Sequence, residues 1–265
     1  MKVSLNGRLV SLDKACFPLN DRGLLLGDGL FETLYYNGHQ LECAEAHWQR
    51  LQKGLMLFEI SFNETFENVH YQIMALLKAN ELINQTAAVR LTVTRGAGAR
   101  GLQIPTQQSP AWIIHTSSYS RFSQPVRLGF SKHGHPGRNA LSAVKHLGYQ
   151  LSVLGRLEAR QKGIEDVLFM NRDGEVVGAT AANIFAVING EIVTPPLASG
   201  CLPGIKRAQV IGRLKSKGMQ ITIRPLLRYE VEESATAIFL TNSLTDAQQV
   251  SHIGGRVLSL QGLGL

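Results

Sequence analysis

The chain has 265 residues, of which 44% are hydrophobic and 18% charged, with 26 glycines and 9 prolines. This composition is that of a globular protein and excludes a disordered or fibrous one. No apolar run approaches the roughly 18 residues of a membrane span. The start, MKVSLNGRLV, has no apolar core of a signal peptide. We therefore expect a cytoplasmic protein that does not bind a membrane.

The net charge of +7 bears on the kind of partner. The lysines and arginines are scattered, without the interleaved aromatic residues that are typical of nucleic-acid binding. A small anionic substrate therefore fits the charge better than a nucleic acid does. Cys16, Cys43 and Cys201 stand far apart and without metal-ligand spacing, so we expect neither a disulfide framework nor a metal site.

The first half of the chain predicts strands, then two helices, then strands. KVSLNGRLV and FETLYYNGHQLE each contain an Asn-Gly pair between apolar runs, which predicts hairpins. Residues 43–58 and the stretch from Asn63, as helix cap, to Asn80 carry apolar residues at helical spacing. AAVRLTVTR and AWIIHTS then predict strands, and SSYSRFSQP a polar connector. We expect a smaller α/β domain over residues 1–117, a connector over 118–124 and a larger domain over 125–265.

The second half opens with a predicted strand at VRLGFSK and a helix over residues 142–162, with Leu147, Leu151, Leu154 and Leu157 on one face. Two hairpins follow, then a helix that starts at Pro203-Gly204, strands at MQITIRPL and ATAIFLT, and a hairpin around Gly254-Gly255. Strands joined by hairpins, with helices grouped apart from them, predict an α+β fold of antiparallel or mixed sheets.

Residues 96–101, GAGARG, match the G-x-G-x-x-G pattern of dinucleotide-binding folds. That motif requires a helix after the last glycine. Here LQIPTQQSP follows, with two prolines and no helical periodicity. We therefore reject a dinucleotide-binding fold.

Lys145 is the first candidate catalytic residue. It lies in SAVKHLGYQLSVL, between Val144 and Leu147, where the predicted helix starts. Burial lowers the pKa of a lysine, and the neutral amine is a nucleophile that forms Schiff bases. Taken alone, a solvated lysine at a helix end is the commoner case.

Several segments in order resemble the fold-type IV pyridoxal phosphate (PLP) enzymes, and among them most the aminodeoxychorismate lyases. They are NDRGLLLGDGLFETL, EAHWQRLQ, VTRGAGARG, VKHLGYQLSVLGR, EDVLFMNRDGEVVGATAANIF, TPPLASGCLPGIKR and FLTNSL, and they cover nearly the whole chain. The resemblance implies a two-domain fold, PLP bound to Lys145 in the larger domain, and a homodimer.

The resemblance also implies a set of site residues. The phosphate of PLP would meet the turn at Gly204-Ile205, the strand end at Thr241-Asn242, and Arg50; backbone N–H groups at a helix start suit a phosphate. Tyr149 would contact the O3′ hydroxyl of PLP, or else pack half-buried in the core. Arg95 and Arg100 flank a glycine loop and would meet an anionic substrate. Glu32 and His47 match positions near the substrate, although a helix histidine such as His47 fits a structural role equally well.

One position departs from the family pattern. Family members carry a glutamate that pairs with the pyridine nitrogen of PLP, and Gly178 stands there in this chain. Glu175 is a poor substitute, because side chains three residues apart on a strand point to opposite faces of the sheet. Two smaller departures from the lyases are Gly148 and Leu102.

The resemblance implies an aminodeoxychorismate lyase, which converts 4-amino-4-deoxychorismate to 4-aminobenzoate and pyruvate in folate biosynthesis. Aromatisation drives that reaction, so it tolerates Gly178 better than a transamination does. One alternative is an aminotransferase for D-amino or branched-chain amino acids on the same fold. A second is a non-catalytic protein that kept the fold.

Overall fold

The structure is a computed structural model that describes residues 1–121 and 124–259. The chain divides into two compact units. Unit 1 comprises Met1–Ser120 and Val144–Gly148, and unit 2 comprises Arg121–Ala143 and Tyr149–Leu265. The predicted connector at 118–124 includes residues 122–123, which lie outside the described residues.

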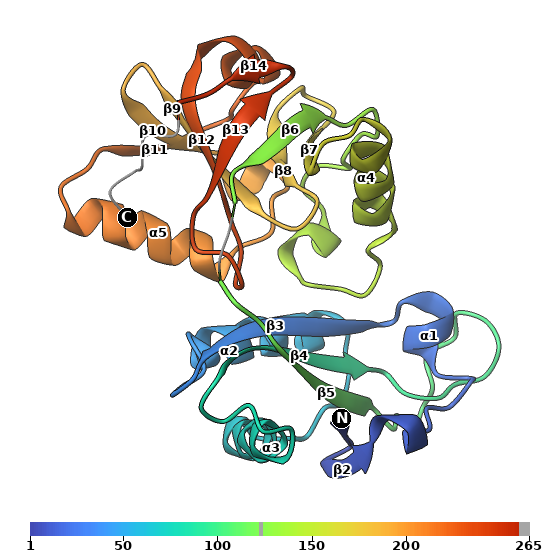
Figure 1. Ribbon diagram of the computed structural model, residues 1–265. Helices are drawn as coiled ribbons and strands as arrows, with labels where there is room; N and C mark the ends of the chain where they lie inside the picture. Colours follow the sequence, from blue (N-terminus) through green and yellow to red (C-terminus); the bar gives the residue numbers. More distant parts are fainter. Residues whose placement is uncertain (122–123, 260–265) are drawn as a thin grey trace. The chain divides into compact units, whose positions relative to one another are not determined.

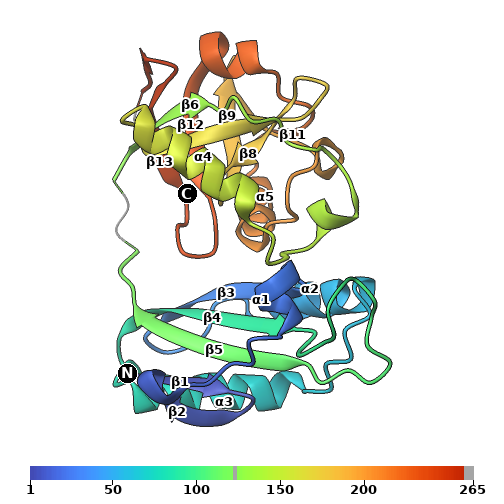
Figure 2. The same cartoon turned by 90° about the vertical axis from the view of Figure 1, so that its right-hand side faces the viewer.

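Unit 1 contains a five-stranded antiparallel sheet in the order β2-β1-β5-β4-β3 (Figures 1 and 2). Its strands are β1 (Lys2–Leu5), β2 (Arg8–Ser11), β3 (Gly29–Asn37), β4 (Thr86–Thr94) and β5 (Ala111–Ser118). The β1–β2 turn is Asn6-Gly7, and both residues have positive φ, at 49° and 74°. Asn-Gly pairs adopt such turns at low cost, so this predicted hairpin is confirmed.

Three helices belong to unit 1: α1 (Arg22–Leu26), α2 (Ala44–Leu57) and α3 (Phe66–Ala79). Helices α2 and α3 cover one face of the sheet, where Leu51, Leu76 and Val89 are among the residues of a shared buried core. Helix α3 begins later than predicted. Its N-cap is Thr65, whose Oγ1 accepts a hydrogen bond from Asn68 N at 3.2 Å, and not Asn63.

Unit 2 is built on a nine-stranded mixed sheet in the order β11-β10-β9-β12-β13-β6-β7-β8, with β14 paired to β13. The strands are β6 (Val126–Phe130), β7 (Asp166–Met170), β8 (Val176–Ala179), β9 (Asn183–Ile188), β10 (Glu191–Thr194), β11 (Ile221–Ile223), β12 (Ala235–Thr241), β13 (Gln248–Ile253) and β14 (Arg256–Val257). The helices are α4 (Gln150–Gln161) and α5 (Ile205–Ser216). Two sheets with helices packed alongside confirm the predicted α+β class.

The helix predicted over residues 142–162 is wrong at its start and in its facing. A short 3-10 turn covers Ala140–Ala143, and α4 starts only at Gln150. Gly155, Glu158 and Ala159 are its buried residues, whereas Leu154 and Leu157 are 45% and 42% exposed. Gly155 explains the facing, because it lets the helix approach Phe169 and Thr180 more closely than any Cβ would allow.

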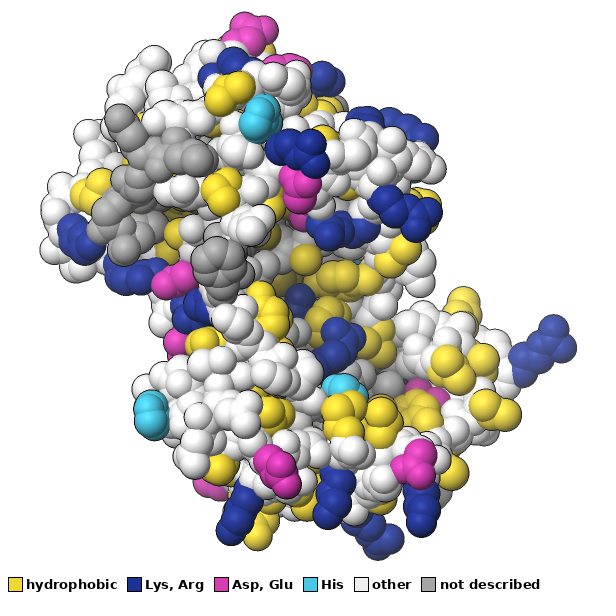
Figure 3. All heavy atoms as spheres, viewed as in Figure 1, with side chains coloured by type: hydrophobic (Ala, Val, Ile, Leu, Met, Phe, Trp, Pro, Cys, Tyr) yellow, Lys and Arg dark blue, Asp and Glu magenta, His cyan; other side chains and the backbone are white. Residues whose placement is uncertain are grey.

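Within residues 1–121 and 124–259, every helix is too short or too polar to cross a membrane. Lysine and arginine side chains are spread over the face drawn in Figure 3 and do not gather in one patch.

Candidate active site

Lys145 lies on an extended segment beside strand β3. Phe31 N donates a hydrogen bond to Lys145 O at 2.9 Å, and Leu147 N donates one to Gly29 O at 3.0 Å. Side chains alternate along an extended segment. Val144 is accordingly buried in the core of unit 1, and Lys145 points to the opposite face, where its Nζ is 4.3 Å from the centre of the Phe31 ring. The lysine therefore belongs to unit 1, which corrects its predicted place on a helix of the larger domain.

The surroundings of Lys145 lower its pKa to about 8. Burial is the largest cause, the charges of Arg50 and Arg90 act in the same direction, and Glu32 opposes them. The Arg90 guanidinium lies 3.6 Å from the centre of the same Phe31 ring. At neutral pH a larger share of this amine is unprotonated than of an ordinary lysine, which favours attack on a carbonyl.

Glu32, His47 and Arg50 form a buried charged cluster next to this segment. Glu32 lies on β3, and His47 and Arg50 are three residues apart on α2, so they share a helix face. Glu32 Oε1 accepts from Arg50 Nε at 2.8 Å, and Oε2 accepts from Arg50 Nη2 at 2.7 Å and lies 2.7 Å from His47 Nδ1. Burial alone would raise the pKa of Glu32, but the hydrogen bonds with Arg50 and His47 lower it below its usual range.

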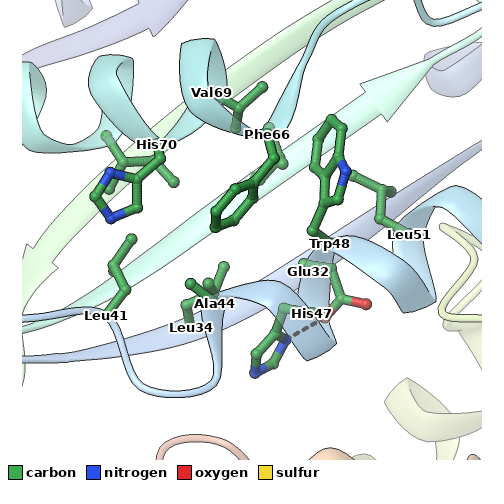
Figure 4. A pocket seen from close by; sticks show the side chains of 12 residues that line it. Glu32, Leu34, Leu41, Ala44, His47, Trp48, Leu51, Phe66, Val69 and His70 are labelled. Carbon is green, nitrogen blue, oxygen red and sulfur yellow. Dashed lines mark hydrogen bonds and ion pairs between the residues drawn. The ribbon is translucent and has the colours of Figure 1, made fainter.

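Figure 4 shows Glu32 and His47 at one side of an apolar pocket between the sheet and helices α2 and α3. Leu34, Trp48, Phe66, Val69 and Leu91 are among the residues that line this pocket. A carboxylate in such surroundings has to be paired. Arg50 and His47 bind both oxygens of Glu32. In the structure Glu32 therefore holds Arg50, whereas the sequence predicted that Glu32 contacts the substrate.

Arg95 is buried, and all the donors of its side chain bind other residues of the protein. Its five N–H groups make five hydrogen bonds, two to the carboxylate of Asp28 and the others to Phe58 O, Glu59 O and Gln108 Oε1. A guanidinium has five donors, so none is left for a substrate. The predicted substrate contact of Arg95 is therefore wrong. Arg100 is exposed and makes no hydrogen bond or ion pair to residues 1–121 or 124–259.

Three charged residues of unit 1 were not among the predicted site residues. They are Arg90, which lies over the Phe31 ring that Lys145 also contacts, and Arg22 and Asp28, which bind the loop that carries Arg100. Arg22 and Asp28 lie in the NDRGLLLGDG segment, which marked the family but suggested no separate role for them. Arg90 could have been found from strand alternation, since it faces away from the buried Val89 and Leu91.

The residues predicted to hold a phosphate lie in unit 2. Helix α5 starts at Ile205 after Gly204, and a Cβ on Gly204 would lie 2.0 Å from Asn183 Oδ1. Thr241, the last residue of β12, pairs with Asn183 on β9. Its Oγ1 is buried and has no hydrogen-bond partner among the described residues. A helix start, whose first N–H groups make no hydrogen bond within the helix, and a buried hydroxyl without a partner among the described residues fit the phosphate of PLP.

Asn242 and Tyr149 have more local roles in the structure. The Oδ1 of Asn242 accepts hydrogen bonds from Leu244 N and Thr245 N, both at 2.9 Å, and so shapes the turn after β12. Its side-chain NH2 is the part that remains suited to a ligand. Tyr149 is the half-buried residue that precedes α4 as its N-cap.

Gly178 lies in β8, opposite Phe169 of β7. Its φ is +155°, and a Cβ at this position would lie 2.7 Å from Ala182 O. Ala179 N donates to the same oxygen at 2.9 Å, which closes the turn between β8 and β9. The chain has no glutamate at position 178, and the backbone conformation of Gly178 disfavours any side chain there.

Comparison with known proteins identifies the relatives of this chain. The family model described as "Amino-transferase class IV" matches residues 29–253. A "Putative branched-chain-amino-acid aminotransferase" of Methanocaldococcus jannaschii is 31% identical over 100% of this chain and 92% of its own length. The "Aminodeoxychorismate lyase" of Vibrio harveyi is 26% identical over 89% of this chain and 87% of its own.

The fold has close counterparts among solved structures. A branched-chain aminotransferase from Thermoproteus uzoniensis superposes with a TM-score of 0.92 at 24% identity, over 99% of this chain and 90% of that one. The predicted fold-type IV architecture is thereby confirmed. Another solved branched-chain amino acid aminotransferase on the same fold, with a TM-score of 0.89, contains pyridoxamine 5'-phosphate. With a family model that spans most of its length and a relative that aligns from end to end, this chain belongs to the class IV aminotransferase family of PLP-fold enzymes.

Proposed function

We propose that this protein is a PLP-dependent aminotransferase that acts on a branched-chain or D-amino acid. The observation that carries the proposal is the half-buried Lys145, whose pKa is lowered to about 8 beside two arginines. This is the nucleophile that a PLP enzyme needs, on the face of the sheet that also presents Phe31 of β3 and Arg90 of β4.

The chain's own residues divide the work. PLP, when bound, supplies a carbonyl that an amine can attack and a ring that accepts an electron pair from the substrate carbon. Lys145 Nζ would hold the cofactor and, once displaced by the substrate amine, take a proton from that carbon. Glu32, which is itself hydrogen-bonded to His47, holds the Arg50 guanidinium. Arg50, Gly204, Ile205, Thr241 and Asn242 are the proposed ligands of the phosphate, and Tyr149 that of the O3′ hydroxyl.

Arg90 and Arg100 are the arginines proposed to bind the substrate's carboxylate. Arg90 contacts the same Phe31 ring as Lys145, and its charge acts on the reactive amine, whereas Arg100 is exposed on the loop after β4. A guanidinium binds a carboxylate with two parallel hydrogen bonds. Arg90 therefore replaces Arg95 in this proposed role.

An aminodeoxychorismate lyase is the second candidate, and Gly178 is the observation that favours it. Without a carboxylate at this position the ring of PLP is a weaker electron sink. A reaction driven by aromatisation depends less on that sink. The relative with 31% identity over the whole chain carries the name of an aminotransferase, and for this reason we place the lyase second.

Single-turnover spectra of the PLP-loaded protein distinguish the two. An aminotransferase given L-valine or D-alanine without an acceptor converts its PLP to pyridoxamine phosphate and releases one equivalent of 2-oxo acid. A lyase given 4-amino-4-deoxychorismate releases fluorescent 4-aminobenzoate over many turnovers and keeps its PLP. If the protein binds PLP but forms neither product, that result would point to the non-catalytic alternative.

Two variants control this experiment. Lys145→Ala should abolish both the visible band of bound PLP and turnover, because the amine that holds the cofactor is gone. Lys53→Ala removes an exposed lysine of α2 and should change neither. An unchanged visible band in Lys145→Ala would overturn the assignment of the lysine.

A further inference from the structure

The connection from β4 to β5, residues 95–110, is long and contains Arg100. Connections longer than about 12–15 residues without secondary structure are uncommon in compact domains unless they have a function. Backbone hydrogen bonds tie the start of this loop to the segment that enters α1. Arg22 N donates to Gly96 O at 2.9 Å, and Gly98 N donates to Asn20 O at 3.1 Å.

Asp28, just before β3, joins two buried arginines. Its Oδ2 accepts from Arg22 Nε at 2.7 Å and from Arg95 Nε at 2.8 Å, and its Oδ1 accepts from Arg95 Nη2 at 3.1 Å. Burial alone would raise the pKa of Asp28, but the two arginines lower it below its usual range. The carboxylate therefore stays ionised at neutral pH and holds both guanidinium groups.

Arg22 donates hydrogen bonds to the tip of the loop. Its Nη1 donates to Gly101 O at 3.2 Å and to Gln103 O at 3.1 Å, and its Nη2 donates to Leu102 O at 3.5 Å. The three carbonyls directly follow Arg100 in the chain. Gly98 completes the fit, because a Cβ there would lie 2.8 Å from Arg22 Cδ.

The two arginines have different tasks. All five donors of Arg95 bind Asp28 and groups at the base of the loop, among them the carbonyls of Phe58 and Glu59. Arg22 alone reaches the three carbonyls after Arg100. Both side chains are 3% exposed, so neither meets solvent or a substrate directly.

We propose that Arg22 is a positioning residue, which fixes the loop tip so that the exposed Arg100 side chain is presented to a substrate carboxylate. This deepens the proposed function and rests on it. Arg22 touches no substrate. It acts through three backbone carbonyls. It must be an arginine, because a planar guanidinium can donate to Asp28 and to the carbonyls at the same time, whereas a lysine ammonium is a compact point charge that cannot bind both.

Hydrogen exchange tests the structural half of the proposal without any turnover. In the PLP-loaded protein, Arg22→Lys should make the amides of residues 96–104 exchange about tenfold faster, because several hydrogen bonds of a charged group are lost. Arg8→Lys, at an exposed arginine of β2 in the same unit, is the matched control and should leave this segment unchanged. Unchanged exchange in Arg22→Lys would overturn the proposal.

A double-mutant cycle tests the functional half. Arg22→Lys and Arg100→Ala should each raise KM by about tenfold, as expected for a lost charged contact, with kcat changed much less. The double variant should be no worse than Arg100→Ala alone, since Arg22 acts through Arg100. Additive effects, or a fall in kcat without a rise in KM, would show a general structural role and overturn the proposal.

The failure of the proposed function gives a different pattern. If the wild-type protein turns over neither an amino acid nor 4-amino-4-deoxychorismate, the proposed activity fails, and the exchange experiment still decides whether Arg22 fixes the loop. If the wild type is active and the cycle is additive, only the positioning role fails.

Discussion

A lysine in water has a pKa near 10.5, so at neutral pH almost none of its amine is unprotonated. Lys145 departs from this because it is partly buried and because Arg50 and Arg90 are both close, and its pKa falls to about 8. The amine becomes mostly neutral above that pH. Its reactivity therefore depends on neighbours that lie far from it in the sequence.

Arg90→Gln should raise the pKa of Lys145, because it removes one of the cations that disfavour the ammonium form. In the wild type, the rate at which cofactor-free protein captures PLP should rise with pH and level off above about 8. In Arg90→Gln the midpoint should move to higher pH. Stopped-flow absorbance across neutral and alkaline pH measures both midpoints, and coincident midpoints would contradict the assigned neighbours.

Glu32→Gln should destabilise unit 1, because it leaves the partly buried Arg50 without its counter-charge. Breaking a buried ion pair by removing one partner costs about 3–5 kcal/mol. The pKa of Glu32 is lower in the folded chain than its usual 4.5. The ion pair therefore stabilises the fold above that pH, and its contribution is lost as the pH falls through the folded value.

Urea unfolding of Glu32→Gln and of the wild type, at neutral and at acid pH, checks this expectation. The difference in the free energy of unfolding should be large at neutral pH and should shrink on acidification. Glu45→Gln, at an exposed carboxylate near the start of α2, is the matched control. A difference that does not depend on pH would argue against the charge as its cause.

At the scale of single elements, the β8–β9 turn explains why a glutamate cannot simply be restored at position 178. Gly178→Ala should destabilise unit 2 by about 1–3 kcal/mol, because its positive φ and the nearby Ala182 O both oppose a Cβ. Gly212→Ala, on α5 with open space where a Cβ would lie, should instead stabilise by about 0.5–1 kcal/mol. Thermal unfolding of both variants measures the contrast, and equal effects would be contrary to it.

Elements with a strong local signal were predictable from the sequence. The Asn6-Gly7 turn, α2 and α3 follow from residue types a few positions apart, and the structure contains all three. The segment around Lys145 was not predictable in this way. Leu147 continues the spacing of the leucines of α4, and only pairing with the distant strand β3 makes the segment extended.

The site was predictable in part, for a related reason. Lys145 and Arg50 were predicted as site residues, and the structure brings them close enough for their charges to interact. The role of Arg95 was wrong, because a glycine loop next to an arginine does not reveal that Asp28 and the Phe58 and Glu59 carbonyls saturate its donors. Contacts of this kind depend on tertiary packing and not on local pattern.

At the scale of the whole molecule, we expect a homodimer, as the family resemblance implies. Leu24, Leu25 and Leu26 on α1 and Leu102 in the adjacent loop are exposed in the single chain. Light scattering should give the mass of two chains of 29.0 kDa each, and Leu25→Glu should shift the protein toward the monomer. A monomeric mass for the wild type at micromolar concentration would contradict this.

The insertion of Val144–Gly148 into unit 1 has a consequence for synthesis on the ribosome. Domains of a nascent chain generally fold as units, the N-terminal one first. Unit 1 ends at Ser120 but takes its last five residues, Lys145 among them, from a later part of the chain. Strand β3 gains this neighbour only after residues 121–148 have been translated and have left the exit tunnel. The nucleophile is thus the last part of unit 1 to arrive, and a truncated nascent chain folds, if at all, without the amine that would bind the cofactor.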